Sequence, residues 1–253
     1  MEKYRGRFSN LGVRLGAPSF VWPAGFSENA AKLKPVFKEV QLTAYEPAVT
    51  SPISDEELSS LRSLNDPEFG YSLHLPIPTS MALPGGAPEK ILSHTMLAYD
   101  KAQIRNYVLH VEKSSDAWNP ALVPERISSL LEATGVSPER ICVENIIGSP
   151  FAEAWESVRG LGVSVCFDVG HWLFEGGNPE EFFDKYGDRI RMAHLHGVAG
   201  GRDHLPLTNI PQATLKKIIA SFAEMKMDGA VIIEIFSPGY MAESLEYLSK
   251  IYG

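Results

Sequence analysis

The sequence is poor in cysteine and in long apolar runs. It has two cysteines in 253 residues, and no apolar stretch approaches the roughly 20 residues that a membrane-spanning helix needs. Cys142 and Cys166 both lie in strand-like apolar runs, which predicts buried free thiols rather than a disulfide framework. The first ten residues, MEKYRGRFSN, are polar and unlike a secretory signal. We therefore expect a cytoplasmic protein with no membrane partner.

Basic residues are also in the minority. The 23 Lys and Arg residues against 31 Asp and Glu residues give a formal net charge of −8. Proteins that bind duplex nucleic acid usually carry a basic surface that displaces counterions from phosphates. The charge balance therefore argues against nucleic acid as a partner and favours a small-molecule substrate.

Short apolar runs alternate with helix-like segments along the whole chain. Each run is rich in Val, Ile and aromatic residues, as is typical of strands buried on both faces of a parallel sheet. The expected strands cover residues 13–20, 38–46, 70–76, 106–114, 140–147, 163–171, 190–198 and 230–237. The expected helices cover residues 28–34, 55–64, 89–103, 123–134, 150–161, 179–187, 214–225 and 241–252.

Two of these helices carry explicit start signals. Ser54 followed by Glu57 three residues later matches a capping box. Asn178 and Pro179 open a second helix with proline at the first helical position, and Gly187 marks its end. These signals support the helix boundaries on either side of the apolar runs.

Eight strand–helix units in this length predict a single α/β domain over residues 1–253, a closed (β/α)8 TIM barrel. The main alternative is an open doubly wound sheet. That fold would carry a glycine-rich phosphate-binding turn after its first strand, and GAPSFVWPAG does not match one.

Ionisable residues gather where the apolar runs end, which is where such barrels place their active sites. They are His74, His110, Glu144, Asp168, His171, His194, His196 and Glu234, followed after the seventh run by Arg202, Asp203 and His204. The remaining histidine, His94, falls inside an expected helix, and we interpret it as a surface or helix-packing residue.

Buried carboxylates are costly unless they are paired, protonated or bound to a metal. Several imidazoles and carboxylates that point at one axis are a natural site for divalent metals, and such mixed ligands accept Zn, Mn, Fe or Co. The pattern therefore predicts a metal centre at the barrel mouth. Strand parity lets both His194 and His196 face inward, so either could be the ligand from the seventh strand.

This residue set resembles the xylose isomerase-like barrel superfamily, which contains endonuclease IV-type phosphodiesterases and sugar isomerases and epimerases. The quartet Glu144, Asp168, His194 and Glu234 is similar to the metal ligands of both branches. His74, His110 and the segment Arg202-Asp203-His204 resemble the additional ligands of the phosphodiesterase branch, although Arg202 stands where that branch has an aspartate. The segments RLGAPSFVWPAGF, LHLP and HLHGVAGGRDHLPL further resemble the CbiR family of cobamide-remodelling phosphodiesterases.

The resemblance implies hydrolysis of the nucleotide-loop phosphodiester of a cobalamin-type corrinoid by two or three metal ions. His74, His110 and Glu144 would hold one metal. Asp168, His194 and Glu234 would hold a second, bridged to the first by Glu144. A further group comprises His171 and His204, with His196 and Asp203 as weaker members, and would hold a third metal or contact the phosphate. The expected catalytic residues are Glu144, Glu234, His204 and Arg202, with Arg202 as a bidentate phosphate clamp.

Two alternatives remain open. In a sugar isomerase or epimerase, Glu144 and Glu234 would flank a single metal and move a proton between carbon atoms. In a non-catalytic corrinoid- or metal-binding protein, the same residues would bind without turnover. Metal stoichiometry separates the phosphodiesterase from the isomerase, and cleavage of a bound cobamide separates an enzyme from a binding protein.

Overall fold

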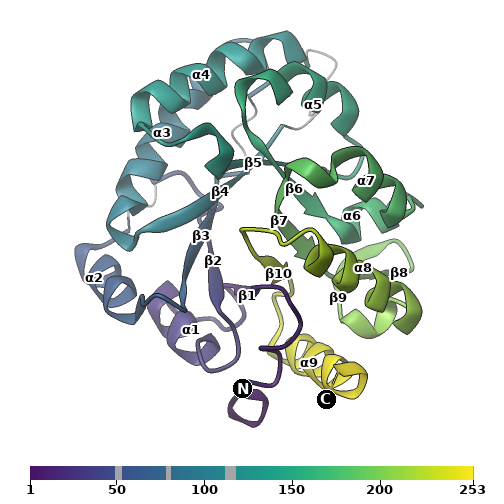
Figure 1. Cartoon of the computed structure of the whole chain (residues 1–253). Coiled ribbons are helices and arrows are strands. Elements are labelled where there is room, and N and C mark those ends of the chain that lie inside the picture. Colours follow the sequence, from purple (N-terminus) through teal and green to yellow (C-terminus); the bar gives the residue numbers. More distant parts are fainter. Residues whose placement is uncertain (49–52, 78–80, 112–117, 253) are drawn as a thin grey trace.

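The computed structural model describes residues 1–48, 53–77, 81–111 and 118–252. Eight parallel strands form a closed barrel, and helices surround it (Figure 1). The barrel strands are β1 (Leu15–Pro18), β2 (Glu39–Thr43), β3 (Gly70–His74), β4 (Ile104–His110), β5 (Ile141–Glu144), β6 (Ser164–Asp168), β7 (Ile190–Leu195) and β10 (Val231–Ile233). This architecture confirms the predicted single (β/α)8 barrel.

Nine α-helices are present in the described part of the chain. They are α1 (Phe26–Leu33), α2 (Asp55–Leu64), α3 (Pro88–Tyr99), α4 (Val123–Thr134), α5 (Phe151–Val158), α6 (Val169–Phe174), α7 (Pro179–Tyr186), α8 (Gln212–Glu224) and α9 (Pro238–Tyr252). Short 3-10 turns lie at Glu2–Tyr4, Asp100–Ala102, Pro120–Leu122, Pro138–Arg140, Arg159–Leu161, Gly187–Arg189 and Leu207–Asn209. No described helix is long and apolar enough to cross a lipid bilayer.

The barrel closes between the first and last strands of the sequence. β1 pairs in parallel with β2 on one side and with β10 on the other, where Leu15 lies opposite Val231. Parallel pairing around the full circle brings all carboxyl ends of the strands to one mouth. The strand-end residues predicted from the sequence are therefore neighbours, although they are up to 160 positions apart in the chain.

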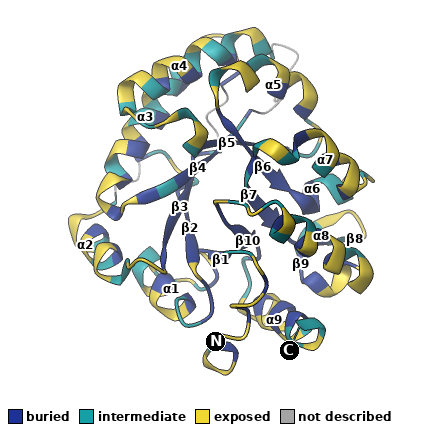
Figure 2. Ribbon diagram, in the orientation of Figure 1, coloured by how far each residue is buried: buried dark blue, intermediate teal, exposed yellow. Residues whose placement is uncertain are grey.

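Burial follows the barrel layers (Figure 2). The strands are almost entirely buried, while the helices bury one face against them and expose the other. Inside the barrel, a small apolar layer contains Val108, Cys142, Cys166, Met192, Ala230 and Ile232. Both cysteines are fully buried free thiols, as predicted. This layer forms the floor beneath the mouth and separates it from the amino ends of the strands.

The capping box at α2 is only half formed. The amide of Glu57 donates to the Ser54 hydroxyl at 3.1 Å, as the pattern predicts. The Glu57 carboxylate, however, accepts from the amide and hydroxyl of Ser27 at 2.6 and 2.8 Å, so it caps α1 instead of α2. Helix α7 follows its prediction, since Asn178 caps it and Pro179 opens it.

Most predicted strands are longer than the observed ones; residues 230–237, for example, form a strand only over Val231–Ile233. Two of these errors, both at the mouth, hide other secondary structure. Residues 163–171 were expected as one strand, but β6 ends at Asp168 because its side chain caps α6 by accepting from the His171 amide at 2.6 Å. The seventh strand ends at Leu195 rather than residue 198. The chain then forms an antiparallel hairpin of β8 (Gly197–Ala199) and β9 (Arg202–Leu205), where a loop was expected. The end of the predicted strand 106–114 lies partly outside the described residues.

Candidate metal centre

Glu144 lies at the centre of the ionisable residues at the mouth. It ends β5 and is directly opposite His110 of β4 in the strand register. Its Oε2 atom is 3.1 Å from His110 Nε2 and 3.4 Å from His74 Nε2. Its other oxygen, Oε1, is 3.1 Å from Nδ1 of His194. The two oxygens of one carboxylate thus face two different groups of imidazoles.

The second group is fully buried. Glu144, Asp168, His194 and Glu234 each place one nitrogen or oxygen atom within 4.8 Å of the others. Nδ1 of His194 is 3.0 Å from Glu234 and 3.6 Å from Asp168. Each of these four side chains is at least 96% buried. Three carboxylates around one imidazole form a compact negatively charged pocket.

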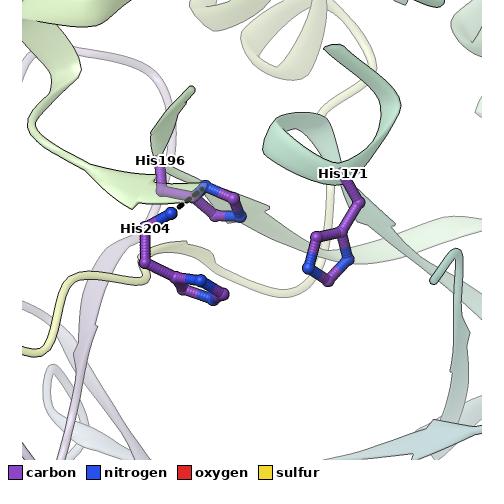
Figure 3. Close-up of side chains that lie close together, drawn as sticks. All are labelled: His171, His196 and His204. Atoms are coloured by element: carbon purple, nitrogen blue, oxygen red, sulfur yellow. Dashed lines mark hydrogen bonds between the residues drawn. The ribbon is translucent and has the colours of Figure 1, made fainter. Parts of the chain in front are cut away.

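His171, His196 and His204 form a third group (Figure 3). His171 comes from α6, His196 follows β7, and His204 lies in β9. The rings of His196 and His204 are stacked with centroids 4.2 Å apart, and the His171 ring is nearly perpendicular to both. Nε2 of His204 is 3.4 Å from Glu234, which joins this group to the quartet.

The hairpin of β8 and β9 brings His204 back over the mouth. Its turn is Gly200-Gly201, and both glycines have positive φ, which an L side chain adopts only with strain. His204 itself has a φ of 50°. The contact between His204 and Glu234 shows that the hairpin folds back over the mouth.

Asp203 and Arg202, which precede His204 in β9, have different environments. Asp203 is half-buried, with one oxygen 3.2 Å from Nδ1 of His204 and the other 4.0 Å from Nε2 of His171. Asp203 therefore lies between His204 and His171. Arg202 is exposed at the start of the strand. Its role as a phosphate clamp stays a prediction.

Both ring nitrogens of His196 are used by the protein. Nδ1 accepts a hydrogen bond from the His204 amide at 3.0 Å, the contact drawn in Figure 3. Nε2 then carries the ring proton and lies 3.1 Å from Oδ1 of Asp168. The ring also packs against Gly170, where an added Cβ would lie 2.1 Å away. His194, whose Nδ1 faces the three carboxylates, is better placed than His196 to be the ligand from β7.

Backbone carbonyls orient two of the other imidazoles. Nδ1 of His74 is 3.0 Å from the Leu75 carbonyl, and Nδ1 of His171 is 3.0 Å from the Asn145 carbonyl. A carbonyl oxygen only accepts, so the proton must be on Nδ1 and the Nε2 lone pair is left for a ligand. This is the outer-shell arrangement typical of metal-binding histidines.

Asn145 was not predicted from the sequence. Its side chain accepts from the Asp168 amide and donates to the Asp168 carbonyl, both at 2.8 Å, so it ties the end of β5 to the end of β6. Its position directly after Glu144 was the only signal that could have indicated it. Tyr45, after β2, was also missed. Its ring meets His74 edge-on with centroids 5.3 Å apart, and burial followed by the charge of Glu234 raises its pKa.

The buried carboxyls and imidazoles of the site shift each other's pKa values in opposite directions. Burial alone would raise the pKa values of the quartet's carboxyls. The adjacent imidazoles outweigh it, so the pKa values of Glu144, Asp168 and Glu234 all lie below their usual range. Burial likewise opposes protonation of His204, but its contact with Glu234 raises the pKa of the imidazole to about 9. The pKa of His194 is raised as well.

These side chains fit divalent metal ions. Their donor atoms are carboxylate oxygens and imidazole nitrogens, the ligands that Zn, Mn, Fe and Co share. Without a cation, the quartet gathers three ionised carboxylates in a buried site, where only protonated imidazoles balance their charge. His74, His110 and Glu144 would hold one ion, and the quartet would hold a second. His94, by contrast, is exposed in α3, as predicted.

Comparison with solved structures shows the same fold at low sequence identity. Endonuclease IV from Thermus thermophilus superposes with a TM-score of 0.73 at 18% identity, covering 94% of this chain and 98% of that one. A D-tagatose 3-epimerase-like protein gives 0.72 at 19% identity, covering 94% and 96%. A D-psicose 3-epimerase gives 0.70 at 17% identity, covering 95% and 100%.

Sequence comparison is more specific about the family. No protein of curated function matches significantly. The model of the family described as xylose isomerase-like TIM barrel matches residues 103–251, which is more than half of the chain. That segment contains every strand-end ligand candidate except His74. The chain belongs to the xylose isomerase-like TIM barrel family.

Proposed function

We propose that the protein is a metal-dependent phosphodiesterase that hydrolyses the nucleotide-loop phosphodiester of a cobamide. The observation that carries the proposal is the position of Glu144 between two ligand groups. One oxygen faces His74 and His110, and the other faces His194. A carboxylate with donors on both sides is suited to bridging two cations, and paired cations are typical of phosphoryl-transfer sites.

Bound cations would neutralise the phosphodiester oxygens, make water more acidic and stabilise the departing alkoxide. In the hydrolysis, the oxygen of water bonds to phosphorus and the bond from phosphorus to the riboside oxygen breaks. The riboside takes up a proton, and the products are cobinamide phosphate and the free riboside. The reaction needs no oxidant or other co-reactant.

The chain's own residues would divide the remaining work. Asp168 and Glu234 contribute the negative charge that holds cations beside Glu144. His204, on the hairpin, is a cationic donor at neutral pH because its pKa is raised, and it can reach a phosphate oxygen. Arg202 lies two residues earlier on the same strand, is exposed, and would bind the phosphate through its planar guanidinium.

The second candidate is a sugar epimerase, favoured by the structural similarity to a D-psicose 3-epimerase. In that function, Glu144 and Glu234 would exchange a proton with the substrate on either side of one metal in the quartet. His74 and His110 would then only shape the substrate pocket. The number of metals bound by the protein therefore distinguishes the two functions.

The experiment has two parts. Wild-type protein is incubated with Zn, Mn, Fe or Co and a panel of cobamides, ketohexoses and abasic-site DNA, and products are identified by mass. Bound metal is then counted in wild type and in His110→Ala. If the protein is the proposed phosphodiesterase, wild type should release the riboside and bind at least two metal ions. His110→Ala should bind one metal ion fewer and turn over at least two orders of magnitude more slowly.

His94→Ala, which changes an exposed histidine of α3, is the matched control for these measurements. A folded His110→Ala variant with normal metal content and normal cleavage would remove His110 from the metal site. Epimerisation of a ketohexose by a one-metal wild-type protein would replace the proposal with the second candidate. Tight binding of a cobamide without cleavage in the presence of any of the four metals would indicate a binding protein.

A further inference from the structure

A cavity of about 290 Å³ lies beside the metal centre, at the carboxyl ends of β1 and β2. Four of its lining residues are aromatic: Phe20, Phe26, Tyr45 and Tyr99. The rings of Phe26 and Tyr99 pack at 6.0 Å with a tilt of 60°, which forms one apolar wall. Thr43 and Glu46 also line the cavity.

Tyr45 connects this cavity to the metal centre. It lines the cavity, and its ring also packs edge-on against His74 at 5.3 Å and against Phe236 at 6.1 Å. Phe236 in turn lies 5.1 Å from the ring of His204. Tyr45 thus borders both the cavity and the imidazole of His74, and a chain of ring contacts through Phe236 continues to His204.

Phe20 lies at the rim of the cavity and is 54% exposed. A single exposed hydrophobic side chain is ordinary on a protein surface. Phe20 differs because it follows β1 at the mouth and borders a concave site already lined by aromatic rings. An exposed ring in this position can stabilise a bound flat ligand by stacking on it, because aromatic pairs favour offset-stacked or edge-to-face contact.

We infer that this cavity, which we call the aromatic subsite, binds a flat heteroaromatic ring that is linked through a ribose to the scissile phosphodiester. The inference rests on the proposed function for the phosphodiester and names the part of the substrate next to it. Pockets for drug-sized ligands measure roughly 300–1,000 Å³, so a cavity of this volume suits one or two fused rings and excludes a macrocycle.

The first test measures ring binding without metal or turnover. Benzimidazole is titrated into the chelator-treated protein and followed by ligand-observed NMR, with cyclohexanol as a non-aromatic probe of similar size. Variants are Phe20→Ala and, as control, Leu97→Ala, which removes an equally exposed side chain on α3. Wild type and Leu97→Ala should bind benzimidazole with the same Kd, and both should bind cyclohexanol more weakly. Phe20→Ala should raise the Kd for benzimidazole about tenfold, the usual effect of removing a stacking ring.

Tyr45→Leu provides a second variant, with Tyr45→Phe keeping the ring. Leucine should weaken benzimidazole binding about as much as Phe20→Ala does, and phenylalanine should retain it. Absence of saturable binding to wild type, equal binding by Phe20→Ala, or equal binding of cyclohexanol would overturn the aromatic subsite.

Failure of this inference and failure of the proposed function give different results. If benzimidazole binds through Phe20 but no phosphodiester is cleaved, the aromatic subsite is supported and the proposed phosphodiesterase activity is contradicted. If a cobamide is cleaved with the same KM by wild type and Phe20→Ala, and benzimidazole does not bind, the phosphodiesterase stands and the aromatic subsite does not.

Discussion

The imidazole of His196 holds Asp168 through a hydrogen bond of 3.3 Å from Nε2 to Oδ2, and the same Nε2 lies 3.1 Å from Oδ1. Oδ1 accepts from the His171 amide at 2.6 Å. These two donors fix the orientation of the carboxylate, with Oδ2 3.6 Å from Nδ1 of His194. His196 therefore acts on the metal centre as a positioning residue, through Asp168.

We predict that His196→Ala lowers the affinity of the quartet for metal by about 10- to 100-fold, the usual effect of losing an outer-shell partner. Zinc affinity, measured by competition with a chromophoric chelator, gives the result without any activity assay. His196→Gln, whose amide can still donate to Asp168, should recover most of the loss. Equal loss in the two variants would mean that His196 is a ligand itself or serves only in packing.

The second prediction concerns pH in the metal-free protein. The pKa of His204 is raised to about 9 in the folded protein, against an ordinary value near 6.5. Its pairing with Glu234 therefore contributes stability fully below pH 6.5 and loses it as the pH rises through 9. The free energy of unfolding, measured with urea in the presence of chelator, should fall by up to about 3 kcal/mol over this range.

His204→Gln should flatten part of that slope, because glutamine does not titrate. His171 and His194, whose pKa values are also raised, act in the same direction and account for the remainder. A metal-free protein with constant stability from about pH 6.5 to 9 would contradict the charged pairing of His204 and Glu234.

The third prediction is that divalent metal stabilises the fold. A ligand that binds only the native state at 100 times its Kd adds about 2.7 kcal/mol. For a domain of this size that corresponds to a rise in Tm of roughly 5–10 °C. Differential scanning calorimetry of chelator-treated and metal-loaded protein measures the rise, which His94→Ala should retain and Glu144→Ala should lose. An unchanged Tm in wild type would argue against a resident metal.

The fourth prediction concerns the base of the hairpin that carries His204. A Cβ at Gly197 would lie 2.2 Å from the Pro206 carbonyl oxygen and 2.8 Å from Asn209. Gly197→Ala must therefore displace the hairpin, and we expect a loss of about 1–3 kcal/mol together with weaker metal binding. Gly160→Ala, at a site with nothing within 4 Å, is the control and should change stability by less than about 0.5 kcal/mol. Equal stability of the two variants would contradict the close packing at Gly197.

Much of the barrel was predictable because its signals are local. The eight apolar runs and the intervening helices follow from residue type and period, and the strand and helix cores match the structure. The errors came where a side chain changed the path of the backbone or found a partner elsewhere. Asp168 ends β6 by capping α6, and Glu57 caps α1 rather than α2. Hydrogen bonds of this kind depend on which groups are close in space, which the linear pattern does not contain.

The sequence by itself determined which residues could bind metal, because parallel strands in a closed barrel must end at one mouth. Only the tertiary structure decided how they are grouped. It divided the two oxygens of Glu144 between separate imidazoles and used both nitrogens of His196 inside the protein. It also placed Tyr45 against His74. The physical reason is that ligand roles depend on the direction of individual lone pairs and rings, and packing across several strands fixes those directions.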